Sequence, residues 1–232
     1  MSLIPHEHYS GIFVKASVER AAQVLLEWGK DVRRFTSAEH RQTPFDHMWT
    51  FLRDRKIPTD RGVLVPHGRD WTAFFDNDRY EQLSSSIGYN LCRLLHAQVF
   101  EFDYDSRSDS VHEGSAILGA WTPSAHNNTP IRRWVMLSKE PSWKFVQTGE
   151  PFPFENVSAY AARKKRDRLT LDMLRSYAES VGIRISDPTA YGSKSVILYE
   201  GKQEPEDVAQ SFGRLRKIFG DKLRLLHPRL EE

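Results

Sequence analysis

Three carboxylates at alternate positions, Glu101, Asp103 and Asp105, have a type and spacing that could support chemistry. Successive side chains of a β-strand point to opposite faces, so these carboxylates would share one face and the aromatic residues between them the other. Such oxygen ligands suit Mg²⁺ or Ca²⁺, and His112 and Glu113 could approach from the next expected strand. The same alternation is typical of an antiparallel strand with one face in water. We therefore expect a solvated acidic face that docks a basic protein partner, and no metal site.

A second constellation consists of Asp187, Glu200 and Lys202, with the aspartate at the end of one expected strand and Glu-x-Lys on the next. This arrangement resembles part of the core of the PD-(D/E)xK nucleases. The resemblance implies that the two carboxylates hold a metal ion and that the lysine positions or activates water. It is confined to the C-terminal part of the chain, and the family's Pro-Asp order is reversed here as Asp187-Pro188. A metal-dependent nucleic-acid enzyme is therefore an alternative function.

A run of cations is the third candidate, and it consists of Arg163, Lys164, Lys165, Arg166 and Arg168. Such side chains can hold phosphate groups, with an affinity that falls as the salt concentration rises. We expect the run to lie on a long helix, where consecutive residues point all around the axis, so a solvated helix is favoured over one phosphate-binding patch. Residues 131–232 carry 19 Lys and Arg against 14 Asp and Glu, whereas residues 61–130 carry 5 against 9. This asymmetry could steer a charged partner.

The familiar catalytic motifs are absent from the sequence, which contains no Gly-x-Ser-x-Gly turn, P-loop, His-Glu-x-x-His helix or Cys-x-x-Cys pair. The nine histidines are scattered, and their spacing completes no set of metal ligands. The single cysteine, Cys92, falls in an apolar helical stretch and is expected to be a buried small hydrophobic residue. We therefore expect a protein that is not an enzyme and has no cofactor.

The composition is that of a globular protein. Of its 232 residues, 39% are hydrophobic and 12% aromatic, which supplies enough apolar material to offset the entropy of ordering the backbone. No run approaches the roughly 20 apolar residues that span a bilayer. The first residues lack the cationic start and apolar core of a signal peptide, and one cysteine excludes an internal disulfide. We expect a cytoplasmic protein that does not enter a membrane.

The elements that position these residues follow from periodicity and from end signals. Ser17 is expected to cap one helix, and Thr43-Pro44-Phe45-Asp46 begins another with a capping hydroxyl and a proline at the first position. The expected helices are 17–28, 44–55, 85–96, 157–181 and 205–219, and Thr170 could divide the fourth of them. The expected strands are 11–16, 62–66, 70–75, 97–104, 114–121, 131–138, 143–148, 183–186 and 195–200.

Short connections between successive strands favour antiparallel neighbours. The sequence thus predicts an α+β protein with a mostly antiparallel sheet, a central meander over about 62–148, and a cover of helices from both ends of the chain. We expect one domain over 1–232, with a weak candidate boundary near 149–157. The leading functional hypothesis is a binding or inhibitory module, of the immunity-protein or adaptor kind, that acts by stoichiometric contact. A nuclease and a small-molecule-binding domain are the alternatives.

Overall fold

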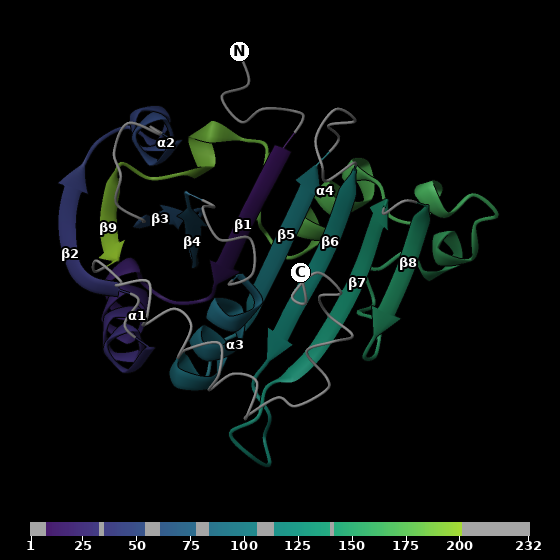
Figure 1. Ribbon diagram of the computed structural model, residues 1–232, viewed down its shortest axis with the longest axis horizontal. Helices are drawn as coiled ribbons and strands as arrows, with labels where there is room; N and C mark the ends of the chain where they lie inside the picture. The colour runs from purple at the N-terminus through teal and green to yellow at the C-terminus, as the bar shows by residue number, and fades with distance from the viewer. Residues whose placement is uncertain are drawn as a thin grey trace, which may run out of the picture.

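The computed structural model describes residues 8–32, 35–53, 61–77, 84–105, 114–139 and 142–200. This part of the chain contains the strands β1 (His8–Val14), β2 (Phe35–Gln42), β3 (Arg61–His67), β4 (Trp71–Asp76), β5 (Val99–Asp105), β6 (Ser115–Thr122), β7 (Ile131–Lys139), β8 (Trp143–Thr148) and β9 (Lys194–Glu200). They form one nine-stranded sheet in the order β2-β9-β3-β4-β1-β5-β6-β7-β8, in which all neighbouring strands are antiparallel (Figure 1). The α+β class and the antiparallel sheet are therefore confirmed, whereas the meander predicted over about 62–148 is interrupted, because β1 lies between β4 and β5.

The helical elements of the described chain are α1 (Val18–Val32), α2 (Phe45–Arg53), α3 (Ser84–Leu95) and α4 (Leu171–Ser180), with the 3₁₀ turns η1 (Val157–Ala161), η2 (Lys165–Asp167) and η3 (Pro188–Ala190). Ser17 caps α1 as predicted, because its hydroxyl accepts a hydrogen bond from the Arg20 N–H at 3.2 Å. The Thr170 hydroxyl caps α4 in the same way, accepting from the Met173 N–H at 3.3 Å. Gly182 ends α4 as predicted and has a left-handed φ of 81°.

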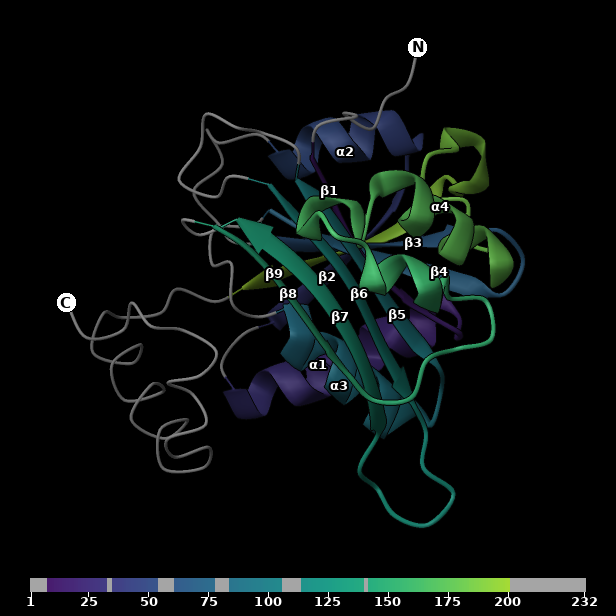
Figure 2. The ribbon, with the colours of Figure 1, turned by 90° about the vertical axis from the view of Figure 1, so that its right-hand side faces the viewer.

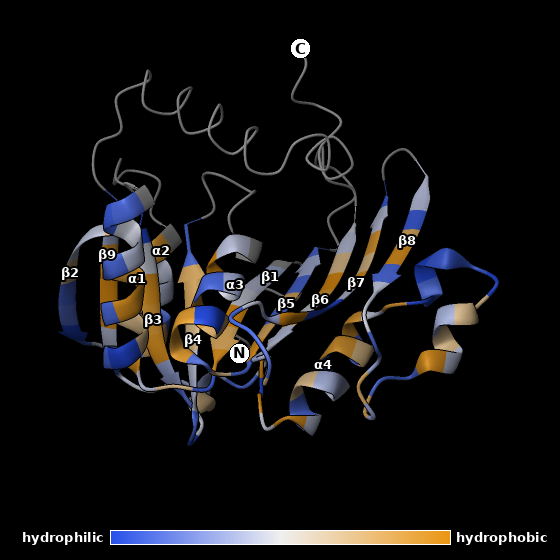
Figure 3. Cartoon of the chain, turned by 90° about the horizontal axis from the view of Figure 1, so that it is seen from below, coloured by the Kyte–Doolittle hydropathy of each residue, from blue (hydrophilic) through white to orange (hydrophobic). Residues whose placement is uncertain are grey.

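Helices cover both faces of the sheet and give the molecule three layers (Figure 2). Because side chains alternate along a strand, β1 contributes Phe13 to one core and Val14 to the other. The helices α1 and α3 pack on the Val14 face, where Leu25 and Leu91 are fully buried. The helices α2 and α4 pack on the Phe13 face, where Leu174 is buried. Figure 3 shows the apolar residues gathered on the strands between these layers. The helix predicted over 205–219 lies outside the described residues.

The structure differs from the sequence predictions at three elements. Strand β2 was not predicted, because six of its eight side chains are exposed and the apolar alternation of a half-buried strand is missing. Residues 183–186, predicted as a strand, form turns, although Ile183 and Ile185 are buried in the core. The helix predicted over 157–181 is in fact η1, η2 and α4, since Thr170 has an extended backbone and starts a new helix.

Two strands from the beginning and end of the described chain lie inside the sheet. Strand β1 is inserted between β4 and β5, and β9 is inserted between β2 and β3. The strand β5 therefore has partners on both sides, and the two edges of the sheet are β2 and β8.

Candidate functional site

The acidic strand is buried rather than solvated. Glu101 and Asp105 are only 1% and 5% exposed, which corrects the expectation that they form an accessible docking face. Asp103 is half-buried and accepts a hydrogen bond from the Ser115 hydroxyl at 3.3 Å. The predicted alternation is right, because Phe102 on the opposite side of β5 is fully buried in the other core. The alternation did not reveal that β5 is an interior strand of the sheet, where little of either face is accessible.

Asp187 belongs to a local turn at the start of η3. Its carboxylate accepts hydrogen bonds from the Thr189 N–H at 2.9 Å and the Thr189 hydroxyl at 2.6 Å, and it pairs with Arg184 at 2.7 Å. The hydrogen bonds from Thr189 are the main cause of the lowered pKa of Asp187. These contacts give Asp187 a structural role as the N-cap of η3.

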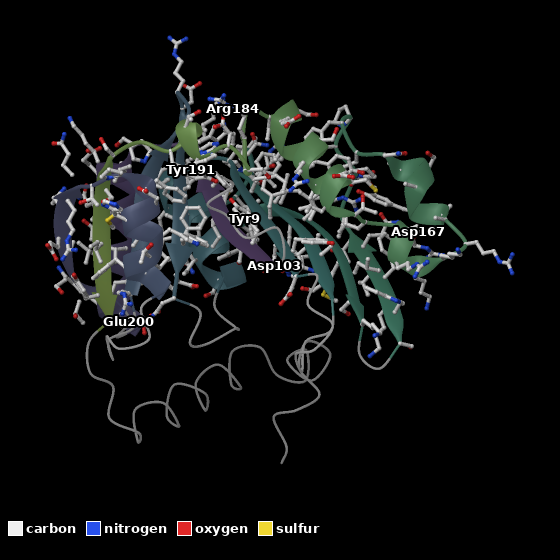
Figure 4. The ribbon with its side chains drawn as sticks, turned by 90° about the horizontal axis from the view of Figure 1, so that it is seen from above. Tyr9, Asp103, Asp167, Arg184, Tyr191 and Glu200 are labelled. Atoms are coloured by element: carbon white, nitrogen blue, oxygen red, sulfur yellow. The ribbon has the colours of Figure 1, made fainter. Side chains whose placement is uncertain are left out.

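Asp187 and Glu200 do not converge on one metal site. The turn at Asp187 lies beside the end of β3 that carries His67, since the Gly68 N–H donates to the Ala190 carbonyl at 2.8 Å. Glu200 lies at the other end of β9, next to the partner of Arg61 (Figure 4). At about 3.3 Å per residue, a strand as long as β9 separates the two carboxylates by roughly 20 Å. The nuclease arrangement is therefore not formed by these two residues, and Lys202 lies outside the described chain.

Among the described residues, no group of three or more His, Cys, Asp or Glu side chains is arranged to hold a metal ion. His112 and Glu113, which were considered as further ligands beside the acidic strand, lie outside the described residues.

The cationic run lies on a compact pair of turns rather than on a long helix. Arg163 to Arg166, which we call the basic segment, run from the connection after η1 into η2, and all four side chains are exposed. Arg166 pairs with Asp167 at 3.6 Å, and the other three cations form no ion pair with any described residue. Arg168 is half-buried: its Nε donates to the Ala162 carbonyl at 2.9 Å, and its guanidinium lies 5.5 Å from the Phe145 ring centre. Four consecutive cations therefore project from one short turn.

A buried ion pair lies beneath this segment. Arg133 of β7 and Glu155 of the following loop pair at 2.6 Å, with side chains 3% and 0% exposed. Glu155 also accepts hydrogen bonds from the Tyr160 hydroxyl and the Phe152 N–H, each at 2.8 Å. Arg133 further donates to the carbonyls of Thr148 and Gly149 and to the Gln147 side chain. This network holds the chain from Phe152 to Tyr160 against strands β7 and β8.

The electrostatics of the network keep the Arg133 guanidinium charged. Burial lowers the pKa of Arg133, but the hydrogen bonds and charge of Glu155 outweigh it and raise that pKa overall. Burial, together with hydrogen bonds that the Tyr160 hydroxyl forms with Tyr177 and Glu155, raises the pKa of this hydroxyl far above its usual range, so it stays a hydrogen-bond donor. The network is thus a satisfied structural support for the basic segment and not a proton-transfer site.

Strand β8 forms the edge of the sheet beside the basic segment. Trp143 and Phe145 face the core and are half-buried, whereas Lys144 and Val146 are exposed. The Phe145 ring lies 5.4 Å from that of Tyr160 in η1, which holds the turns against the strand. Asp167, labelled in Figure 4, marks the place of η2 at this end of the molecule, far from Glu200. The basic segment and β8 are therefore neighbours, and we call them together the basic edge.

A histidine and two tyrosines are buried together near η3. His67 is 0% exposed, and its Nε2 accepts a hydrogen bond from the Arg184 N–H at 3.0 Å. The Tyr191 hydroxyl donates to the Ile185 carbonyl at 3.1 Å and lies 3.4 Å from the Tyr9 hydroxyl. Burial is the largest cause that lowers the pKa of His67, to about 4, and the charge of Arg184 adds to it. A neutral, tightly packed histidine of this kind supports the fold.

Sequence reasoning missed Arg133 and Glu155, although one signal was available. Arg132 and Arg133 are consecutive in a strand, so one of them must point into the core. A buried guanidinium needs a charged or polar partner, but the sequence does not say that Glu155, 22 residues away, supplies it.

None of the described helices is long and apolar enough to cross a membrane. Comparisons with protein-family models, with curated proteins and with solved structures give no match to this chain.

Proposed function

We propose that this chain is a protein-binding module of the inhibitory or adaptor kind that docks an acidic surface of its partner at the basic edge. One observation carries the proposal: four consecutive exposed cations project from a short turn segment beside a buried hydrogen-bond network. A segment fixed before binding loses little conformational entropy on association. Its positive charge would favour fast, salt-sensitive encounter with an acidic partner.

The exposed apolar side chains support a protein as the partner. Ile131, Val146 and Val157 are the large hydrophobic residues of the described chain that are exposed, at 62%, 44% and 47%. Val146 and Val157 lie on β8 and η1, the elements that adjoin the basic segment, and Ile131 lies at the start of β7. Protein interfaces combine apolar contacts with Arg side chains, whereas phosphate backbones are held mainly by cations and hydrogen-bond donors. An acidic protein is therefore favoured over a nucleic acid.

This proposal keeps the class of function predicted from the sequence but reverses the charge of the partner. The sequence favoured a basic partner at Glu101, Asp103 and Asp105, and burial of Glu101 and Asp105 removes that surface. The exposed cations of the basic segment take its place.

Binding of poly-L-glutamate by the purified protein tests the proposal. The test variant replaces four cations by glutamine at Arg163, Lys164, Lys165 and Arg166. The control variant removes the same charge from four exposed cations elsewhere, at Lys15, Lys30, Arg69 and Lys194. Exposed ion pairs contribute about 0.2–1 kcal/mol each, so we expect the test variant to bind about tenfold or more weakly.

Duplex DNA of matched charge is the competing ligand in the same titration. Preference for poly-L-glutamate, lost in the test variant and kept in the control variant, is the expected result. Equal loss of affinity in both variants would mean that net charge alone drives binding, and preference for DNA would transfer the site to a nucleic-acid partner.

A further inference from the structure

The outer edge of β8 presents backbone groups that no other strand of the described chain uses. Among the described strands β8 is the last of the sheet, and its one strand partner there is β7. Its backbone forms no hydrogen bond with any other backbone of the described chain. In an antiparallel strand, every second residue directs its N–H and C=O away from its one partner. These groups can accept another strand.

The geometry of β8 suits such pairing. All six residues of the strand are in regular register with β7, from Trp143 opposite Lys139 to Thr148 opposite Trp134, without a bulge. The strand contains no proline. Val146, Gln147 and Thr148 are exposed at its second half. A regular edge with β-branched side chains is a good template for an added strand.

The other edge of the sheet is a poorer template. Strand β2 has an irregular register against β9 between Phe35 and Ser37. Its side chains form their own ion pair, Arg41 with Glu39 at 2.8 Å, and Glu39 also accepts a hydrogen bond from Tyr199 at 2.8 Å. Glu39 would repel an acidic incoming strand there, and Arg41 would repel a basic one. Of the two edge strands, β8 is therefore the better site for strand addition.

The charge around β8 identifies the incoming strand. Lysine on an edge strand commonly prevents pairing, because burying its charge against another chain is costly. Lys144 occupies such a position, and the basic segment adds four more cations beside the strand. Phe145 faces η1 and η2, so Lys144 points to the opposite face of the sheet. An acidic extended segment removes this barrier when carboxylates on one of its faces neutralise Lys144 and those on the other neutralise the basic segment. The edge thus discriminates against neutral or basic strands, including the edges of other copies of this chain.

We infer that β8 binds an extended acidic segment of the partner protein, which adds to the sheet as a further antiparallel or parallel strand. This inference rests on the proposed function and specifies how the partner docks: backbone hydrogen bonds come from β8, and charge selection comes from the basic segment and Lys144.

Two synthetic peptides test this mode of binding. The first is a capped heptapeptide of sequence Glu-Glu-Val-Val-Glu-Glu-Val, which presents carboxylates on both faces of an added strand. The second has the same sequence but is N-methylated at two adjacent central residues, which blocks both of its edges because adjacent N–H groups point in opposite directions. Binding to the full chain is followed by NMR titration, and amide hydrogen exchange is measured across β8 and β2. A lysine–valine heptapeptide controls for charge.

The expected result is that the unmodified acidic peptide binds at least tenfold more tightly than its N-methylated form and slows exchange of alternate amides within 143–148. Equal binding of the two acidic peptides, or protection at β2 in place of β8, would overturn the inference while acidic binding itself stands. Failure of both acidic peptides and of poly-L-glutamate to bind would remove the proposed function, and strand addition with it.

Discussion

At the scale of single residues, the buried pair of Arg133 and Glu155 carries the largest energetic consequence. Both charges are removed from water, and each is compensated only by the other and by the surrounding hydrogen bonds. A buried pair is costly to break on one side, because the remaining charge is left without compensation. Replacing both partners by apolar residues of similar volume is much less harmful.

We expect Glu155→Leu or Arg133→Met alone to lower the free energy of unfolding by about 3–5 kcal/mol. The double variant should recover most of this loss, since no unpaired charge remains. Chemical denaturation of the three variants measures the effect. A double variant as unstable as the sum of the two single variants would contradict the view that the pair acts as one unit.

His67 makes stability depend on pH. Its pKa is lowered to about 4 in the folded state, mainly by burial, against about 6.5 when exposed. The unfolded chain therefore takes up a proton at this site first as the pH falls, so stability is full above about pH 6.5 and decreases toward pH 4. Linkage gives a loss of about 2 kcal/mol between about pH 7.5 and 5.

A His67→Gln variant should remove this part of the pH dependence, because the glutamine oxygen can accept the Arg184 N–H without titrating. Denaturation midpoints at the two pH values, compared between wild type and variant, measure the difference. An unchanged slope in the variant would assign the pH dependence to other groups.

At the scale of elements, the turn between β8 and the PFPF segment depends on one glycine. Gly149 has a φ of 79°, and a Cβ atom placed there would collide with the Arg132 carbonyl. Gly68 also has a positive φ, of 58°, but a Cβ there would meet only the Gly182 carbonyl at 3.8 Å. An alanine at Gly68 therefore measures the cost of a positive φ alone, whereas an alanine at Gly149 measures that cost together with the cost of a collision.

We expect Gly68→Ala to cost about 1 kcal/mol of stability and Gly149→Ala clearly more, about 3 kcal/mol. The second change should also weaken binding of poly-L-glutamate, since it displaces the chain that leads to the basic segment. Thermal denaturation and the binding titration measure both effects. Equal costs at the two positions would show that the collision at Gly149 is relieved by local movement.

Most elements could be predicted from the sequence, but the site could not. Strands with apolar alternation and helices with capping residues, such as that begun by Ser17, follow from local chemistry. The edge strand β2 lacks that signal, and the burial of Glu101 depends on which strands flank β5. The basic segment was recognised by composition, but its exposure on a turn depends on Thr170, which starts α4 afresh. Long-range pairing decides the first two of these outcomes, and a local cap at Thr170 decides the third.

At the scale of the whole molecule, one sheet separates two apolar cores. Leu25 of α1 lies in one core and Leu174 of α4 in the other, and both are at most 1% exposed. The strands β1, β3, β4, β5, β6 and β9 contribute buried side chains to both cores. The cores therefore share their backbone and should lose their structure together.

We expect Leu25→Ala and Leu174→Ala each to cost about 2–5 kcal/mol and to leave a single unfolding transition, as the prediction of one domain requires. Far-ultraviolet circular dichroism and tryptophan fluorescence, followed in the same titration, should report coincident midpoints. Separate transitions for the two variants would instead divide the molecule at the sheet.

The position of β9 sets the order in which the chain can acquire its structure. Among the described strands, β2 has β9 as its one partner, and Phe35 pairs with Glu200. During synthesis, β2 leaves the ribosome long before the strand that joins it to β3 exists. The pairings of β9 with β2 and with β3 can therefore form only after nearly the whole described chain has been synthesised. Strand pairings between residues so distant in sequence also form slowly. The nascent protein then exposes the β3 edge, where a chaperone would be needed most.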